Sequence, residues 1–255
     1  MDKEAILRRI LQQWNIKLSD EQTGQLITFY ELLFEKNKVM NLTAITDFEE
    51  VCSKHFLDSL SAVKLFGEGE DWKRLSGAKK TPALIDVGCG AGFPGIPLAI
   101  FYPELQVTLL DSLQKRVFFL QEVIEKAALT NCCAFHARAE EFAREKEHRQ
   151  AYDIAVSRAV ANLSTLSEYC LPFVKKGGIF IAYKSSGIRQ EAPAAKRALT
   201  LLGGSFERQV EFDLPIPTEE GEEEKAYRNL YVVRKSADTP DKYPRKAPLA
   251  KKEPL

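Results

Sequence analysis

The stretch Asp86-Val87-Gly88-Cys89-Gly90-Ala91-Gly92-Phe93-Pro94-Gly95 decides the fold. It continues a short apolar run that begins at Ala83, and it is followed by a second apolar run over 96–101. Glycine permits a tight turn and lets a ligand approach the backbone closely. The stretch therefore predicts a strand, a glycine-rich turn and a helix, with a ligand held at the end of the strand.

Further apolar runs follow along the chain and have the length of buried strands. They cover 107–111, 132–137, 154–156 and 179–183. Continuous apolar runs of this kind suit strands that are buried on both faces. Helical patterns lie between them, for example over 117–127, and strands that alternate with helices indicate a parallel α/β sheet.

The last strand-like runs differ, because no helix fits between them. They cover 206–214 and 227–233, and only the turn-forming, acidic segment 215–225 separates them. Two strands joined by a loop form an antiparallel hairpin. We therefore predict a seven-stranded sheet that is mostly parallel and ends in an antiparallel hairpin.

The first part of the chain is predicted to be helical. Apolar residues from Ile6 to Trp14 recur at helical spacing, and Ser19 with Gln22 has the pattern of a capping box. Asp47 with Glu50 is expected to cap a third helix. The polar, glycine-bearing segment 67–81 is the predicted linker. We thus expect a helical N-terminal region over 1–75, a ligand-binding domain over 76–238 and a basic C-terminal tail over 239–255.

Composition narrows the function classes. No run of 18 apolar residues occurs and the first residues have mixed charge, which predicts a cytoplasmic protein without a membrane span. The five cysteines contain no CxxC pair, so no metal site is predicted. Lys plus Arg equals Asp plus Glu at 36 each, so net charge gives no support for nucleic-acid binding. The tail is basic nevertheless. The sequence carries no signal for an oligomeric state, and we expect a monomer.

Asp111 and the glycines together indicate an adenosine-containing cofactor. Asp111 ends the second strand, where a carboxylate accepts hydrogen bonds from ribose hydroxyls. An NAD-binding loop has the pattern GxGxxG, but here Phe93 stands where the last glycine would be, and an aromatic residue would crowd a pyrophosphate. S-adenosylmethionine has no pyrophosphate, and the terminal hairpin is typical of methyltransferases. The pattern favours S-adenosylmethionine over NAD.

Several segments, taken in order, resemble the ribosomal small-subunit methyltransferase G family, also called glucose-inhibited division protein B. The resemblance covers about residues 5–235. The segments that carry it, besides the glycine loop, are Asn41-Leu42-Thr43-Ala44-Ile45, His55-Phe56-Leu57-Asp58-Ser59-Leu60, Asp111-Ser112-Leu113-Gln114-Lys115-Arg116, Ser157-Arg158-Ala159-Val160-Ala161 and Leu171-Pro172-Phe173-Val174-Lys175-Lys176-Gly177-Gly178. The tail departs from the family pattern, because the family's Gly-Thr-Pro step is replaced by Lys246-Ala247-Pro248.

The resemblance implies a Rossmann-like class I methyltransferase fold and a defined reaction. The family methylates guanine N7 at position 527 of 16S ribosomal RNA, as naked RNA or in the small ribosomal subunit. Carried over by motif, the cofactor contacts are Gly88 and Phe93 in the loop, Ala139 and Glu140 beside the adenine, and Arg158 after the fourth strand. With the glycines and the acid discussed above, the predicted cofactor-binding residues are Gly88, Gly90, Gly92, Phe93, Asp111, Ala139, Glu140 and Arg158.

No catalytic residue is predicted. Guanine N7 is a lone-pair acceptor without a hydrogen, so the reaction needs no general base. Alternatives stay open for several side chains. Arg158 binds cofactor or RNA, or forms an ion pair with Asp86 or Asp153. His55 faces the cleft or is simply packed, with Asp58 on the same helix face.

Two further alternatives concern lysines. Lys184 either contacts phosphate or is solvated. The tail cations either contact RNA or only keep a disordered tail soluble. Two rival functions also remain, namely a methyltransferase for a small molecule and a cofactor-binding regulator without catalysis.

Overall fold

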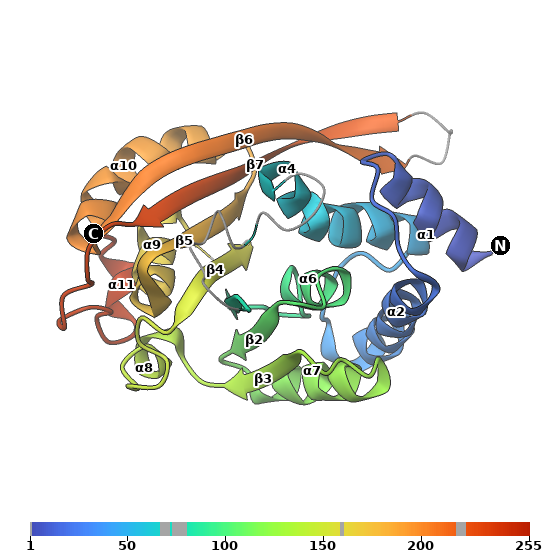
Figure 1. Cartoon of the computed structure of the whole chain (residues 1–255), viewed down its shortest axis with the longest axis horizontal. Helices are drawn as coiled ribbons and strands as arrows, with labels where there is room; N and C mark the ends of the chain where they lie inside the picture. Colours follow the sequence, from blue (N-terminus) through green and yellow to red (C-terminus); the bar gives the residue numbers. More distant parts are fainter. Residues whose placement is uncertain (1, 67–71, 73–80, 159–160, 218–222) are drawn as a thin grey trace.

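The fold is built on a mixed sheet that confirms the predicted arrangement (Figure 1). The computed structural model describes residues 2–66, 72, 81–158, 161–217 and 223–255. Within these, seven strands are ordered β3-β2-β1-β4-β5-β7-β6, and β1 to β5 run parallel while β7 is antiparallel to both of its neighbours. The strands are β1 (Ala83–Val87), β2 (Gln106–Asp111), β3 (Cys132–His136), β4 (Tyr152–Arg158), β5 (Val174–Lys184), β6 (Gly204–Pro217) and β7 (Glu223–Lys235).

Helices cover both faces of the sheet. In Figure 1, α8, α9 and α10 lie on one side of the strands, and α2, α6 and α7 lie on the other. The helical elements are α1 (Lys3–Gln12), α2 (Asp20–Met40), α3 (Phe48–Val51), η1 (Cys52–Leu57), η2 (Leu60–Ala62), α4 (Val63–Phe66), α6 (Gly95–Phe101), α7 (Gln114–Lys126), α8 (Ala139–Phe142), α9 (Leu163–Cys170), η3 (Leu171–Phe173), α10 (Ile188–Leu201) and α11 (Leu249–Lys252).

Each face of the sheet has its own apolar core, because successive side chains of a strand point to opposite faces. Leu84 of β1 belongs to the core under the N-terminal helices, α6 and α7, whereas its neighbour Ile85 belongs to the core under α9 and α10. Both side chains are fully buried. This double burial explains why the central strands appear in the sequence as continuous apolar runs.

The caps of the N-terminal helices were predicted correctly, but the third helix is not regular. Ser19 and Gln22 form a capping box at the start of α2, and the Asp47 side chain accepts a hydrogen bond from the Glu50 N–H. After α3 the chain winds as a π-helix, η1, before returning to tighter turns. A π-turn has more residues per turn than an α-helix, so the faces expected from an α-helical period do not apply to 52–57.

Two predicted connecting segments lie partly outside the described residues. These are the linker over 67–81, of which 72 and 81 are described, and the acidic segment 215–225, which lacks 218–222. Trp72 is 1% exposed and its ring centroid lies 4.9 Å from that of Tyr102, the residue that follows α6. No helix in the described parts of the chain has the length and apolar character that crossing a membrane requires.

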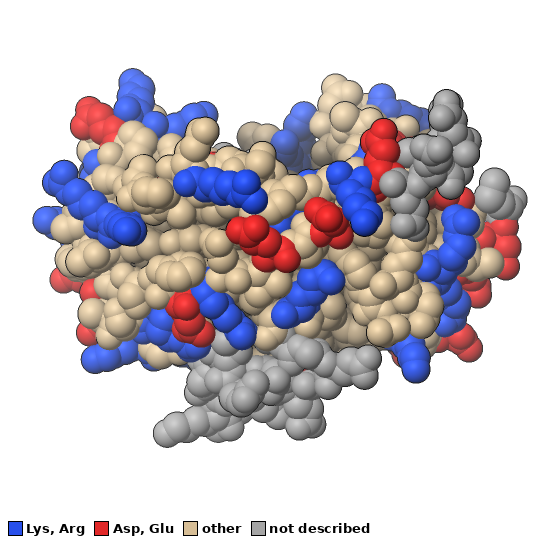
Figure 2. Space-filling model, turned by 90° about the horizontal axis from the view of Figure 1, so that it is seen from above, with Lys and Arg blue, Asp and Glu red and all other residues tan. Residues whose placement is uncertain are grey.

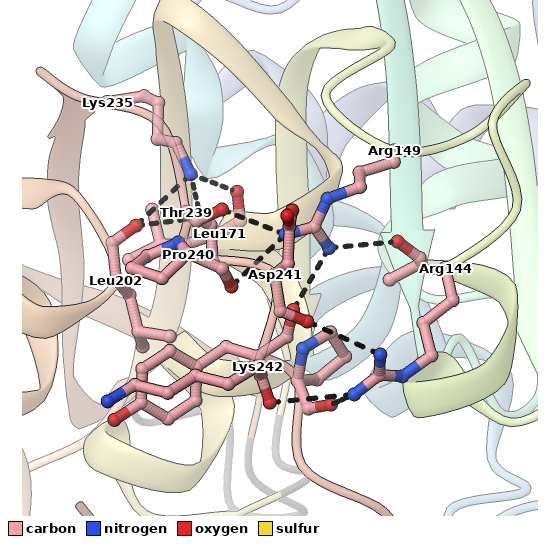
Figure 3. A network of polar contacts seen from close by, with 12 residues as sticks. Arg144, Arg149, Leu171, Leu202, Lys235, Thr239, Pro240, Asp241 and Lys242 are labelled. Carbon is pink, nitrogen blue, oxygen red and sulfur yellow. Dashed lines mark hydrogen bonds and ion pairs between the residues drawn. The ribbon is translucent and has the colours of Figure 1, made fainter.

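The C-terminal tail is docked on the sheet domain through its backbone carbonyls (Figure 3). Arg144 donates to the carbonyls of Asp241, Lys242 and Pro244, and Arg149 donates to those of Thr239, Pro240 and Tyr243. Because the acceptors are main-chain groups, this docking depends little on which residues the tail carries.

A buried lysine joins the same network. Lys235 donates to the Leu171 carbonyl (2.8 Å), to the Leu202 carbonyl (3.1 Å) and to the Thr239 hydroxyl. Burial, with the nearby Arg149 charge, lowers the pKa of Lys235 to about 7. The start of the tail is therefore fixed to the end of β7.

Candidate functional site

The glycine loop has the backbone conformation that glycine alone adopts readily. The φ angles of Gly88, Gly90 and Gly92 are +72°, +60° and +99°. A Cβ atom at Gly90 would meet no atom within 4 Å, so the backbone there faces open space. The loop thus leaves room for a ligand directly against its main chain.

Asp111 holds this loop in place. Its Oδ2 accepts a hydrogen bond from the Gly90 N–H at 2.9 Å, and its Oδ1 accepts one from the Leu113 N–H at 2.8 Å. Arg116 lies 3.5 Å from the same Oδ2. The carboxylate is 4% exposed. Each carboxylate oxygen has a second lone pair, so the role predicted for Asp111 at a ribose stays compatible with these contacts and stays a prediction.

Asp86 lies beneath the loop and has an unusual ionisation. Its Oδ2 accepts a hydrogen bond from the Gly95 N–H at 2.7 Å, and its buried Oδ1 has no hydrogen-bond partner among the described residues. Burial raises the pKa of Asp86 to about 7, against the opposing effects of the Gly95 hydrogen bond and Arg158. A buried carboxylate oxygen without a partner is a group that a bound ligand satisfies.

These two observations fit S-adenosylmethionine. Open space at Gly90 admits an adenosine group, and the unpaired Asp86 oxygen suits a ligand that carries an amino group and a sulfonium. The described residues contain no group of three or more His, Cys, Asp or Glu side chains that could hold a metal ion.

Phe93 is a core residue rather than an exposed loop residue. It is 5% exposed, and its ring centroid lies 5.0 Å from that of Phe29 on α2 and 4.5 Å from that of His55, which stacks on it. The aromatic residue that distinguishes this loop from an NAD loop thus joins the loop to the N-terminal helices. Its predicted cofactor contact is not tested by this geometry.

Arg158 lies over the Phe93 ring and forms an ion pair, one of the alternatives considered for it, with a partner that the sequence did not indicate. Its guanidinium carbon is 5.1 Å from the ring centroid. Its Nη1 donates to Asp58 Oδ2 at 2.9 Å. The alternative of an ion pair named Asp86 or Asp153 as the partner, and those partners were wrong: Asp86 accepts from Gly95, and Asp153 pairs with Lys175. The cofactor or RNA role of Arg158 stays a prediction.

Asp58 is shared by a second arginine. Its Oδ1 lies 3.2 Å from Nε of Arg228, and the residue is 5% exposed. Asp58 follows η1, Arg158 ends β4 and Arg228 lies on β7. One carboxylate therefore joins three elements that are far apart in the sequence. Arg228 was missed by sequence reasoning, because a lone arginine in a β-strand carries no motif.

His55 is half-buried and neutral. Its Nε2 lies 2.8 Å from the Thr43 hydroxyl, and its Nδ1 lies 3.3 Å from Nη2 of Arg158. Burial first, and then the Arg158 charge, lowers the pKa of His55 to about 3. The structure thus places His55 both in a packed position and beside the glycine loop, so the two alternatives considered for it hold together.

Lys184 fits neither alternative that the sequence left open. It donates to Oε2 of Glu191 at 2.7 Å and to the Ala161 carbonyl at 2.6 Å, and its side chain is 8% exposed. It is neither solvated nor a free phosphate ligand. Glu191 also accepts from the Leu163 N–H at 2.7 Å, so this ion pair fixes the start of α9.

Ala139 and Glu140, predicted to border the adenine, begin α8 after β3. Glu140 is 7% exposed. It lines a cavity of about 620 Å³ together with Arg138, Arg144 and Lys246. Lys246 and its neighbours Ala247 and Pro248 come from the tail, so the docked tail forms one wall of the cavity beside the predicted cofactor residues.

The tail cations have different surroundings. Arg245 pairs with the fully buried carboxylate of Glu168 through Nε (2.9 Å) and Nη2 (2.6 Å), and it is not available to RNA. Lys251 and Lys252 of α11 are exposed. The alternative of a disordered tail does not hold for the described residues.

The comparison with known families decides the assignment. The family model of rRNA small subunit methyltransferase G matches residues 22–214, which is more than half of the chain. The chain belongs to this family.

Curated relatives extend the match over the whole chain. The ribosomal RNA small subunit methyltransferase G of Alkaliphilus metalliredigens is 44% identical over 255 residues, which is 100% of both chains. The protein of the same name from Lachnoclostridium phytofermentans is 47% identical and covers 96% of this chain and 94% of its own. Among solved structures, precorrin-6y C5,15-methyltransferase from Geobacter metallireducens has a TM-score of 0.47 and 15% identity over 68% of this chain and 91% of that chain.

Proposed function

We propose that this protein transfers a methyl group from S-adenosylmethionine to N7 of a guanine in 16S ribosomal RNA, at position 527. The observation that carries the proposal is family membership over the full chain, together with a glycine loop whose backbone faces open space. The relatives are named for methylation of small-subunit ribosomal RNA, and the guanine N7 position follows from the resemblance of the motifs.

The cofactor binds against the glycine loop and its neighbours in this proposal. The residues involved are Gly88, Gly90, Gly92, Phe93, Asp111, Ala139, Glu140 and Arg158. Gly90 offers its open main chain, and Asp111 keeps that main chain in place. Phe93, in contact with both His55 and Arg158, keeps the end of the loop rigid. Rigid positioning of this kind is what methyl transfer requires of the protein.

The chain does not need to move a proton. S-adenosylmethionine, when bound, supplies an electrophilic methyl group. Guanine N7 presents a lone pair and no hydrogen, so no side chain has to act as a general base. His55 suits this chemistry, because the low pKa keeps its ring neutral and adds no positive charge beside a cationic cofactor. We also propose that the protein acts in the cytoplasm as a monomer.

A transfer assay with two RNA substrates tests the proposal. Purified protein is incubated with labelled S-adenosylmethionine and with either naked 16S RNA or small subunits that lack the methyl group. The methylated nucleotide is then mapped by mass spectrometry. Label at N7 of guanine 527 is the expected result. Label in a metabolite pool alone, or cofactor binding without transfer to any RNA, contradicts the proposal and indicates a small-molecule enzyme or a regulator.

A further inference from the structure

A second cavity lies beside the glycine loop, where β4 and β5 end. It has a volume of about 520 Å³. The N-terminal helices contribute His55 and Asp58 to its lining, the strand ends contribute Arg158, and the hairpin contributes Arg228. Arg158 also lies over the Phe93 ring, so this cavity shares a wall with the loop predicted to hold the cofactor. The methyl acceptor must reach the loop from an adjoining space, and this cavity is such a space.

The lining of the cavity combines positive charge with apolar surface. Four cations and two carboxylates line it among the described residues, and they are Lys54, Arg158, Lys184, Arg228, Asp58 and Glu191. Ile45, Phe212 and Leu230 add apolar walls. A nucleotide has the same two parts, a flat base and an anionic phosphate. The volume also lies within the usual range of ligand sites, about 300–1,000 Å³.

The face of the molecule over the β6–β7 hairpin has no comparable concentration of positive charge. Figure 2 shows that acidic and basic side chains are scattered over this face among uncharged ones, without a large area of one sign. The chain as a whole carries equal numbers of acidic and basic residues. Lys54 pairs with Glu50 and Lys184 pairs with Glu191, whereas Arg158 and Arg228 share the single carboxylate of Asp58. The two arginines therefore keep an excess of positive charge, which points to an anionic ligand.

Asp58 holds the two arginines of the cavity in fixed positions. Its oxygens lie 2.9 Å from Nη1 of Arg158 and 3.2 Å from Nε of Arg228. Arg228 also donates from Nη1 to the Tyr227 carbonyl, whereas its Nη2 has no partner among the described residues. The Arg228 side chain is 27% exposed. A guanidinium that is fixed on one edge and open on the other is suited to bind a phosphate oxygen.

We propose that this cavity receives the acceptor nucleotide of the RNA, with Arg228 contacting a phosphate and Asp58 acting as the positioning residue for Arg228. The inference rests on the proposed function and deepens it. A base that reacts inside a pocket has to leave its stack, and the apolar walls offer it a new surface. Lys54 lines the same cavity, pairs with Glu50 and is 25% exposed, so its ammonium can add a second contact to the RNA backbone from within that pair.

Substitution of Arg228 tests the inference against a matched control. Arg189 of α10 lies over the ring of Tyr227, which neighbours Arg228 on β7, and it pairs with Glu211 of β6. It does not line the cavity. We expect R228Q to raise the KM for small subunits about tenfold, because a charge-assisted hydrogen bond is lost. It should also reduce the slope of log KM against log salt by about 0.7, the value for one phosphate contact of a single strand. R189Q should change neither quantity, and both variants should bind S-adenosylmethionine with the wild-type Kd.

D58N and K54Q extend the test if R228Q folds poorly. D58N releases both arginines, so it should raise the KM for RNA at least as much as R228Q, and its Kd for S-adenosylmethionine reports separately on Arg158. K54Q should raise the KM for RNA and lower the salt slope as R228Q does, and it leaves the side chains of Asp58, Arg158 and Arg228 unchanged. A wild-type KM and salt slope in R228Q and K54Q, or equal impairment in R189Q, overturns the inference while RNA methylation by the wild type still stands. Failure of the wild type to methylate any RNA overturns the proposed function itself.

Discussion

Gly90 and Gly95 lie in one loop but should respond differently to alanine. Gly90 has a φ of +60° with open space around a Cβ, so G90A should fold with about 1–2 kcal/mol of backbone strain. The added methyl group occupies the space proposed for the cofactor, and we expect the Kd for S-adenosylmethionine to rise at least about tenfold, a change of about 1.4 kcal/mol. A wild-type Kd in a folded G90A protein would place the cofactor elsewhere.

At Gly95 the added Cβ would lie 2.8 Å from Asp86 Oδ2 and would collide with Leu109 Cδ2. G95A should therefore lower the free energy of unfolding by about 1–3 kcal/mol even without cofactor. Urea unfolding measures this. Gly24, on α2 with open space around it, is the control, and G24A should be neutral or slightly stabilising.

His55 should stay neutral far below the usual pH range of histidine. Its pKa is about 3 in the folded protein and about 6.5 in the unfolded chain. Between these values the unfolded chain binds the extra proton, so the contribution of His55 to stability is present above pH 6.5 and is lost as the pH falls toward 3. Relative to that of H55N, the free energy of unfolding of the wild type should fall by up to about 1.4 kcal/mol for each pH unit in this window.

Urea unfolding of both proteins at pH 7, 6 and 5 measures the His55 effect. An NMR titration supplies an independent readout, because the His55 ring signal should not shift between pH 8 and pH 5. A midpoint near 6.5 for that signal would show that the ring is exposed to water.

Residue-scale sequence reasoning succeeded where a residue acts through its neighbours in the chain. The strand, the glycine turn and Asp111 form one local pattern, and the structure joins Gly90 to Asp111 by a hydrogen bond. It failed for Arg158, whose partner Asp58 is 100 residues away in the sequence. That contact depends on how the N-terminal helices dock on the sheet, and no local pattern encodes docking.

At the scale of elements, the strands were predictable and their ends were not. The hairpin strands were expected over 206–214 and 227–233, whereas β6 and β7 reach Gly204–Pro217 and Glu223–Lys235. Polar residues extend both strands because the ladder is made of backbone hydrogen bonds, which composition does not reveal. The π-helix η1 was missed for a similar reason, since its sequence also fits an α-helix.

The docked tail should contribute measurably to stability through Arg245. R245Q leaves the fully buried Glu168 carboxylate without its charged partner. We expect the free energy of unfolding to fall by about 3–5 kcal/mol. E168Q should cost less, because Arg245 is 20% exposed and can be solvated. The double variant R245Q/E168Q should be more stable than R245Q alone. Urea unfolding measures all three.

The exposed Lys251 provides the control for the tail, and K251Q should stay within about 0.5 kcal/mol of the wild type. Equal stability of R245Q and K251Q would mean that the tail is not docked in solution.

At the scale of the whole molecule, the predicted division at residue 75 does not coincide with a gap in packing. Phe29 of α2, Phe93 of the glycine loop and Leu230 of β7 belong to one continuous apolar core. The Asp58 carboxylate also joins the N-terminal region to β4 and β7 by ion pairs. The division into 1–75, 76–238 and 239–255 stays a prediction about roles. The shared core indicates that 1–75 and 76–238 are one unit of folding.

The two tryptophans allow this cooperativity to be measured directly. Trp14 packs edge-on against Phe212 of β6 with a centroid distance of 5.3 Å, and Trp72 packs against Tyr102. Both belong to the first 75 residues, so tryptophan fluorescence reports how that part is packed, whereas far-UV circular dichroism reports the helices and strands of the whole chain. If the shared core makes one folding unit, the two signals should give the same urea midpoint and the same slope. Fluorescence that changes at a lower urea concentration than circular dichroism would show that the N-terminal helices separate first, and the site would then lose His55 and Asp58 while the sheet is still folded.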